Sequence, residues 1–111
     1  MSGWIDLIKQ RLGSEDSVQT NFYASYERTA GILILSKGKL FFVEEKGFLH
    51  KTYNIILEIP YEKIREETAV YHDLMITDAE GKRHTFRTIG VSASIVEEHL
   101  KELMPVPGAV R

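Results

Sequence analysis

Hydrophobic and polar residues alternate along the middle of the chain with a period of two, from about residue 18 to residue 88. This alternation is typical of half-buried β-strands. Turn-forming residues interrupt the alternation at short intervals. The pattern predicts seven strands, at residues 18–27, 32–35, 40–43, 52–59, 64–70, 74–77 and 82–88. The fourth is the clearest, and we expect one of its faces to carry Tyr53, Ile55, Leu57 and Ile59.

The turns between these strands also have recognisable residues. Residues 28–31 separate the first two strands, and Pro60 ends the fourth. We expect Gly38 to supply a positive φ in the turn that follows the second strand. Asp78 and Gly81 mark a turn before the seventh strand.

At both ends of the chain the period changes to 3.6, which indicates amphipathic helices. The first helix is predicted at residues 2–12, with Ser2 as its cap and Gly13 at its end. The second follows Gly90, is capped by Ser92 or Ser94, and has a capping box formed by Ser94 and Glu97. Its apolar face is expected to carry Ile95, Val96, His99, Leu100, Leu103 and Met104.

These elements predict one mainly β domain with three sequence regions. Residues 1–13 form an amphipathic helix, residues 18–104 form the domain, and residues 105–111 (PVPGAVR) form a flexible tail. Short antiparallel strands need closure or a cover for their edges. We therefore expect a bent β-barrel whose end is plugged by the C-terminal helix.

Several local sequence marks resemble the GRAM and bacterial PH-like branch of the pleckstrin-homology superfold. The resemblance extends over roughly residues 22–104. A glycine opens the second strand and an L-x-L-S-x-x-x-L-x-F pattern follows; an I-P-apolar-x-x-I segment ends the fourth strand, and an aromatic residue precedes the last helix. The residues that match are Gly31, Leu33, Leu35, Ser36, Leu40, Phe42, Ile59, Pro60, Tyr61, Ile64 and Phe86. The resemblance implies a seven-stranded bent antiparallel barrel capped by a C-terminal helix, here with an extra short N-terminal helix.

The same resemblance implies a binding or assembly module. PH-like domains include phosphoinositide binders, peptide binders and assembly modules. The phosphoinositide binders resemble one another in a basic pattern across the first two strands. Here the first loop supplies only Arg28, and residues 32–35 (ILIL) contain no basic residue. An inositol-phosphate pocket is therefore not expected.

The loop between the third and fourth strands is the main candidate for a binding surface. In PH-like domains the loops after strands one, three and six share the open end of the barrel. We therefore expect one surface to contain Arg28, Lys46, Phe48, Leu49, His50, Lys51, Lys82 and Arg83. Phe48 and Leu49 have two interpretations: they enter a membrane among cations, or they fold back onto the protein. We expect the second, because glycine followed by Phe-Leu can turn the chain back.

The N-terminal helix has a similar pair of interpretations. Trp4, Ile5 and Ile8 lie on its apolar face. A helix with Trp, Lys and Arg can lie on a membrane, but such a helix more often covers an exposed sheet edge or face, which is what we expect here. A dimer contact is the remaining alternative.

Composition narrows the function classes. With 111 residues and 43% hydrophobic residues, the chain suits one globular domain. Its net charge of −2 argues against nucleic-acid binding, since such modules are usually basic. A small nucleic-acid-binding β-barrel, using aromatic residues as stacking surfaces, is the alternative function.

Nothing in the sequence predicts catalysis. There is no cysteine, and the four histidines have no metal-ligand spacing. We therefore expect a non-enzymatic module without a cofactor, binding a protein partner or an anionic membrane surface, with self-association as an open alternative. Because no apolar run is long enough to span a bilayer and no secretory signal is evident, the expected location is the cytoplasm, with membrane association as a further alternative.

Overall fold

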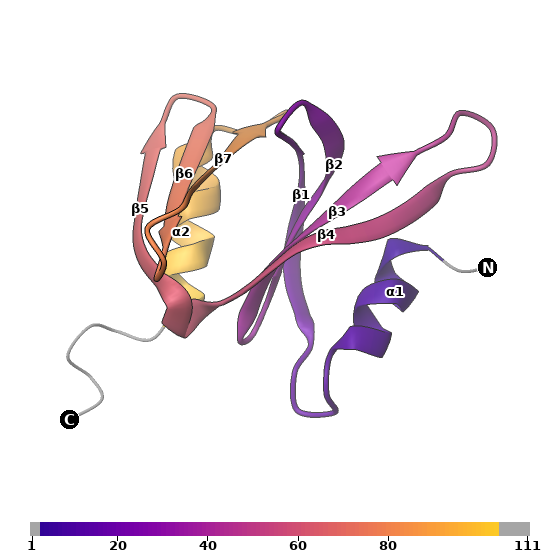
Figure 1. Cartoon of the computed structure of the whole chain (residues 1–111), viewed down its shortest axis with the longest axis horizontal. Coiled ribbons are helices and arrows are strands. Elements are labelled where there is room, and N and C mark those ends of the chain that lie inside the picture. The colour runs from indigo at the N-terminus through magenta and orange to yellow at the C-terminus, as the bar shows by residue number, and fades with distance from the viewer. Residues whose placement is uncertain (1–2, 105–111) are drawn as a thin grey trace.

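The computed structural model describes residues 3–104 (Figure 1). The predicted tail and the predicted cap Ser2 lie outside the described residues. A short 3₁₀ helix, η1, links the fourth strand to the fifth. The elements are α1 (Trp4–Arg11), β1 (Val18–Tyr26), β2 (Thr29–Ser36), β3 (Lys39–Lys46), β4 (Thr52–Pro60), η1 (Tyr61–Lys63), β5 (Ile64–Val70), β6 (Asp73–Asp78), β7 (Arg83–Thr88) and α2 (Ala93–Leu103).

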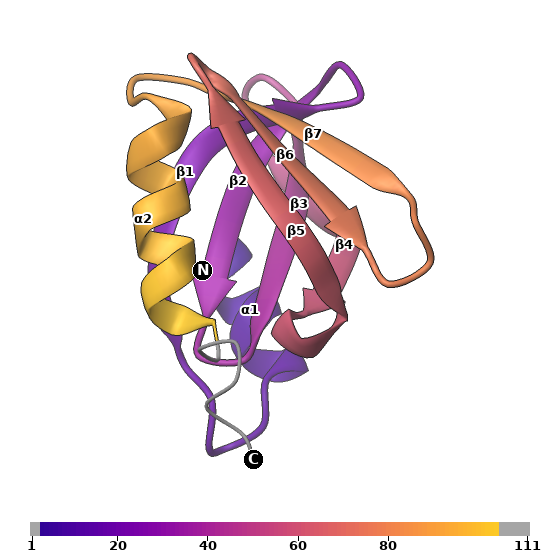
Figure 2. The ribbon, with the colours of Figure 1, turned by 90° about the vertical axis from the view of Figure 1, so that its left-hand side faces the viewer.

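The seven strands form one antiparallel sheet with the order β4-β3-β2-β1-β7-β6-β5. β1 pairs with β2 along its whole length but with β7 only over its last three residues, Ala24 to Tyr26. The sheet therefore bends at this junction into two layers, β1–β4 and β5–β7, and α2 packs on β5 and β6 (Figure 2). This confirms the predicted mainly β, barrel-like architecture with a helix cap and an extra N-terminal helix.

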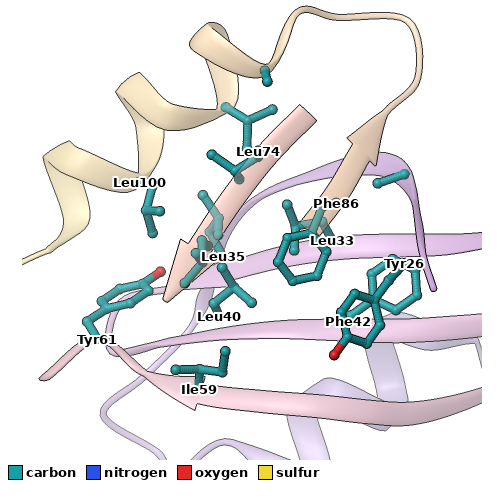
Figure 3. Packing of buried hydrophobic residues seen from close by; sticks show 14 residues of the cluster. Tyr26, Leu33, Leu35, Leu40, Phe42, Ile59, Tyr61, Leu74, Phe86 and Leu100 are labelled. Carbon is teal, nitrogen blue, oxygen red and sulfur yellow. The ribbon is translucent and has the colours of Figure 1, made fainter. Parts of the chain in front are cut away.

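The main core fills the space between the two layers and α2 (Figure 3). Aromatic rings from three strands meet there: the rings of Tyr26 and Phe86 stack with centroids 5.0 Å apart, and Phe42 lies 5.6 Å from Tyr26. Leu100 of α2 closes the cluster and is fully buried. The core therefore joins both layers to the helix.

A second, smaller core lies on the opposite face of β2 and β3. It contains Ile32, Ile34, Phe41 and Val43, and Ile8 of α1 is fully buried against them. This confirms that α1 covers a sheet face. Because both faces of β2 and β3 are buried, these strands are apolar at consecutive positions rather than alternating ones.

The prediction for β4 is wrong in one respect. The pairing with β3 shifts at this point: Phe42 lies opposite Leu57, but the next residue, Val43, lies opposite Ile55. Ile56 is thus the extra residue of a β-bulge, which reverses the inward face of the strand. Leu57 and Ile59 consequently pack in the main core, whereas Tyr53 and Ile55 pack in the second core.

Two turns also differ from expectation. β2 begins at Thr29, not at residue 32, because the preceding turn needs only Glu27 (φ 51°) and Arg28 (φ 66°). Left-handed residues at both positions suit the twist of a hairpin. Gly38 does not have the predicted positive φ. Its turn is held by Asp16, whose carboxylate accepts hydrogen bonds from the amides of Lys37 (2.7 Å) and Gly38 (3.3 Å).

The predicted capping box of α2 is also wrong. Ser92 occupies the N-cap position without a side-chain cap bond, and the amide of Ala93 instead donates to the carbonyl of Tyr71 at 2.8 Å. The buried face of the helix is narrower than predicted, because α2 meets the sheet along one line: Ile95 is 43% exposed and His99 is exposed beside the ring of Phe22.

Candidate functional site

The β3–β4 hairpin protrudes from the molecule beyond α1 (Figure 1). Pairing continues to its end, where Lys46 lies opposite Thr52. Gly47 then turns the chain with φ 104°, and a Cβ at this position would lie 2.2 Å from the carbonyl oxygen of His50. A glycine is therefore required for a tip this tight.

The tip exposes its two large apolar side chains. Phe48 is 90% exposed and Leu49 is 83% exposed, so the expectation that they fold back onto the protein is wrong. The physical reason is the hairpin itself. Its paired strands carry the loop past the edge of the molecule, and the nearest apolar sheet face is already covered by α1.

The structure brings this tip together with the beginning of α1. Trp4 and Ile5 line the same hollow, of about 650 Å³, as Phe48 and Leu49. Ile5 is 45% exposed, whereas Ile8, which belongs to the same predicted apolar face of the helix, is fully buried and takes no part. We call the surface formed by Trp4, Ile5, Phe48 and Leu49 the apolar tip.

The charged residues beside the apolar tip are arranged unevenly. Lys46 lies 3.8 Å from Glu44 and Lys51 lies 3.5 Å from Glu45. The lysine side chains are 67% and 51% exposed, but those of the two glutamates only 16% and 23%. The ammonium groups therefore extend outward while the carboxylates are recessed. His50 is exposed in the same loop.

The other predicted surface residues do not all join the apolar tip. Arg28 lies in the β1–β2 turn, at the same end of the molecule (Figure 1). Lys82 and Arg83 lie at the β6–β7 turn. Figures 1 and 2 both show this turn well below the β3–β4 tip, and in Figure 1 the two are also far apart horizontally. The prediction that they gather is wrong, because the second layer crosses the first and directs this turn elsewhere.

Sequence reasoning missed a buried polar chain. His84, only 3% exposed, has its Nδ1 2.8 Å from the hydroxyl of Tyr26 and its Nε2 3.0 Å from a carboxylate oxygen of Asp78. The alternation along β7 places residue 84 on the inward face, which was the available signal. Both ring nitrogens of His84 have a hydrogen-bond partner, so these three side chains tie the β6–β7 turn to β1.

Two further findings concern the described residues. Within residues 3–104, no group of three or more His, Asp or Glu side chains is placed to hold a metal ion. In the same range no helix is long and apolar enough to cross a membrane.

Comparisons with known proteins inform the fold but not the site. No protein-family model matches the chain, and no curated protein does. Among solved structures, it is similar to the C-terminal domain of an unknown protein from Leishmania infantum, with a TM-score of 0.63 at 9% identity. The match covers 81% of this chain and 86% of that chain. At this identity the similarity shows the fold alone.

Proposed function

We propose that this protein is a non-enzymatic, PH-like binding module that attaches to anionic membrane surfaces through the apolar tip. The observation that carries the proposal is the exposure of Phe48 and Leu49 side by side at the end of a protruding hairpin. Adjacent exposed apolar groups of this size mark interaction surfaces. The order of seven strands and a C-terminal helix supports the PH-like assignment, which remains part of the proposal.

The energetics of the tip suit a lipid interface. Full burial of a Phe or Leu side chain is worth about 1.5–3 kcal/mol each. The outward ammonium groups of Lys46 and Lys51 would each add about 1 kcal/mol near an anionic surface. Tryptophan, the residue at position 4, prefers the boundary between headgroups and acyl chains. Apolar insertion and electrostatic attraction would thus act at one place.

The competing partners fit this tip less well. A nucleic acid needs a basic groove, whereas each of these lysines lies beside a glutamate. A protein partner would need a pocket that receives the protruding hairpin end. A fluid interface accepts a protruding apolar hairpin end without a preformed pocket.

Co-sedimentation with vesicles tests the proposal. We expect the native protein to bind vesicles of phosphatidylcholine containing 30% phosphatidylserine, and the Phe48→Ser/Leu49→Ser variant to bind at least about tenfold less well. The matched control is Ile56→Ser, which removes a side chain of 43% exposure from the β4 bulge and should leave binding unchanged. Circular dichroism verifies folding.

Absence of binding by the native protein would overturn the membrane proposal and favour a protein partner. Binding that the double variant retains would instead show that a different surface contacts the lipid.

A further inference from the structure

Three hairpin turns lie at one end of the molecule. In Figures 1 and 2, which share a vertical axis, the β1–β2 turn, the β3–β4 tip and the β5–β6 turn all lie along the upper edge. In Figure 1 the β1–β2 turn lies between the other two, and the β5–β6 turn and the β3–β4 tip are well separated along the longest axis. The end therefore offers a broad contact rather than a single point.

The β5–β6 turn is a second exposed apolar site at this end. Tyr71 is 88% exposed, and the preceding residue, Val70, is 46% exposed. Ile89, which follows β7, is 56% exposed. It is placed beside the turn because the amide of Thr88 donates to the carbonyl of His72 at 2.7 Å. None of these residues belongs to the apolar tip.

The turn is hydrogen-bonded to its neighbours through its backbone and leaves the Tyr71 side chain exposed. Tyr71 has φ 55°, a left-handed conformation that bulky residues rarely adopt. Its carbonyl accepts the hydrogen bond from Ala93 that starts α2, so the backbone of the turn is fixed by the helix. A strained conformation retained for a fully projecting tyrosine is the kind of outlier that motivates a functional hypothesis.

We infer that the β5–β6 turn is a second membrane contact, so that the protein lies on the bilayer with this whole end down. The inference rests on the proposed function, since it assigns a second anchor and an orientation to the same attachment. The occupant is a lipid surface because two exposed apolar sites at opposite sides of one end can both meet a plane. Arg28 is exposed in the β1–β2 turn, which lies between them in Figure 1, and follows Glu27 in the chain. Tyrosine is a residue type that favours the membrane interface.

The absence of cysteine from the chain allows a direct test. Single variants Phe48→Cys, Tyr71→Cys and Lys82→Cys are each labelled with a polarity-sensitive nitrobenzoxadiazole dye. On addition of the same 30% phosphatidylserine vesicles, we expect a blue shift and quenching by nitroxide-labelled lipid at positions 48 and 71. The label at position 82, in the β6–β7 turn, should not respond.

A response at 48 but not at 71 would overturn the second contact and leave the apolar tip as the anchor. No response at either position, together with no sedimentation, would show that the proposed function itself fails. Equal responses at 71 and 82 would overturn the orientation.

Sedimentation of unlabelled variants provides an independent measurement. We expect Tyr71→Ser to lower vesicle binding by about 3- to 10-fold. The matched control is Tyr23→Ser, which removes a tyrosine of 63% exposure from the middle of β1 and should have no effect. Unchanged binding by Tyr71→Ser would overturn the inference. Because this variant carries no dye, the result does not depend on whether labelling perturbs the turn.

Discussion

At the scale of single residues, Gly31 shows why a small side chain is needed inside β2. A Cβ built there would lie 2.1 Å from the carbonyl oxygen of Val43 and 2.8 Å from the ring of Phe42. Both neighbours belong to β3, and Phe42 is part of the main core. We expect Gly31→Ala to lower the free energy of unfolding by about 2–4 kcal/mol, measured by urea denaturation.

Gly38→Ala is the control for this prediction. Gly38 has no positive φ, and its nearest atom to an added Cβ is a carboxylate oxygen of Asp16 at 3.3 Å. That side chain can shift slightly, so we expect a change of less than about 1 kcal/mol. Equal effects at the two glycines would contradict the close approach of β2 and β3.

Asp78 makes stability depend on pH. The hydrogen bond from His84 lowers the pKa of Asp78 below its ordinary value of 3.8; desolvation opposes the shift, and the amides of Lys82 and Glu80 reinforce it. A lowered folded-state pKa means that the stabilisation is complete above about pH 4 and is lost as pH falls through the folded value. We therefore expect Asp78→Asn to be less stable than wild type at pH 7, with a difference that narrows toward pH 3.

Urea denaturation at several pH values between 7 and 3 would measure this difference. Glu80→Gln, a change of an exposed carboxylate in the same turn, should differ from wild type by an amount that is small at every pH. If the stability difference between Asp78→Asn and wild type stayed constant across this range, the hydrogen bond from His84 would not lower the pKa of Asp78.

At the scale of elements, α1 is held by one deeply buried residue. Ile8 is fully buried in the second core, whereas Ile5, one turn earlier on the same helix, is 45% exposed. We expect Ile8→Ala to lower the free energy of unfolding by about 2–4 kcal/mol, because it leaves a cavity against Phe41 and Ile34. Ile5→Ala should cost less than about 1 kcal/mol in the same urea experiment, and similar costs would contradict the docking of α1.

The periodicity of the sequence predicts the strands better than the turns that connect them and the bulges that interrupt them. The predicted bounds of β5, residues 64–70, agree with Ile64–Val70 because Pro60 before the strand and residues 71–73 after it mark its two ends. The bulge at Ile56 is not predictable from the sequence pattern. Tyr53, Ile55, Leu57 and Ile59 are apolar at every second position, so the pattern places all four on one face and does not mark the inserted residue. The β1–β2 turn is similarly hidden, because its two left-handed residues are Glu and Arg rather than glycine.

At the scale of the whole molecule, only part of the candidate site could be predicted. The sequence indicates the exposed loop at Phe48 and Leu49, but their exposure depends on how far the hairpin projects beyond α1. Their meeting with Trp4 depends on how α1 docks, and no local pattern records that docking. No local pattern singles out Tyr71, because its position at the same end follows from the bend between the two layers.

This arrangement predicts that the position of charge, and not its total, governs membrane attachment. Lys46→Gln/Lys51→Gln and Lys82→Gln/Arg83→Gln each remove two positive charges and change the net charge from −2 to −4. At about 1 kcal/mol for each cation near an anionic surface, the first pair should weaken binding to 30% phosphatidylserine vesicles by about 30-fold and reduce its salt dependence. The second pair lies at the β6–β7 turn, away from the docking end, and should change binding less than about threefold. Equal weakening by both variants in sedimentation at 0.05 and 0.15 M salt would mean that attraction is a property of overall charge, and the proposed orientation would be wrong.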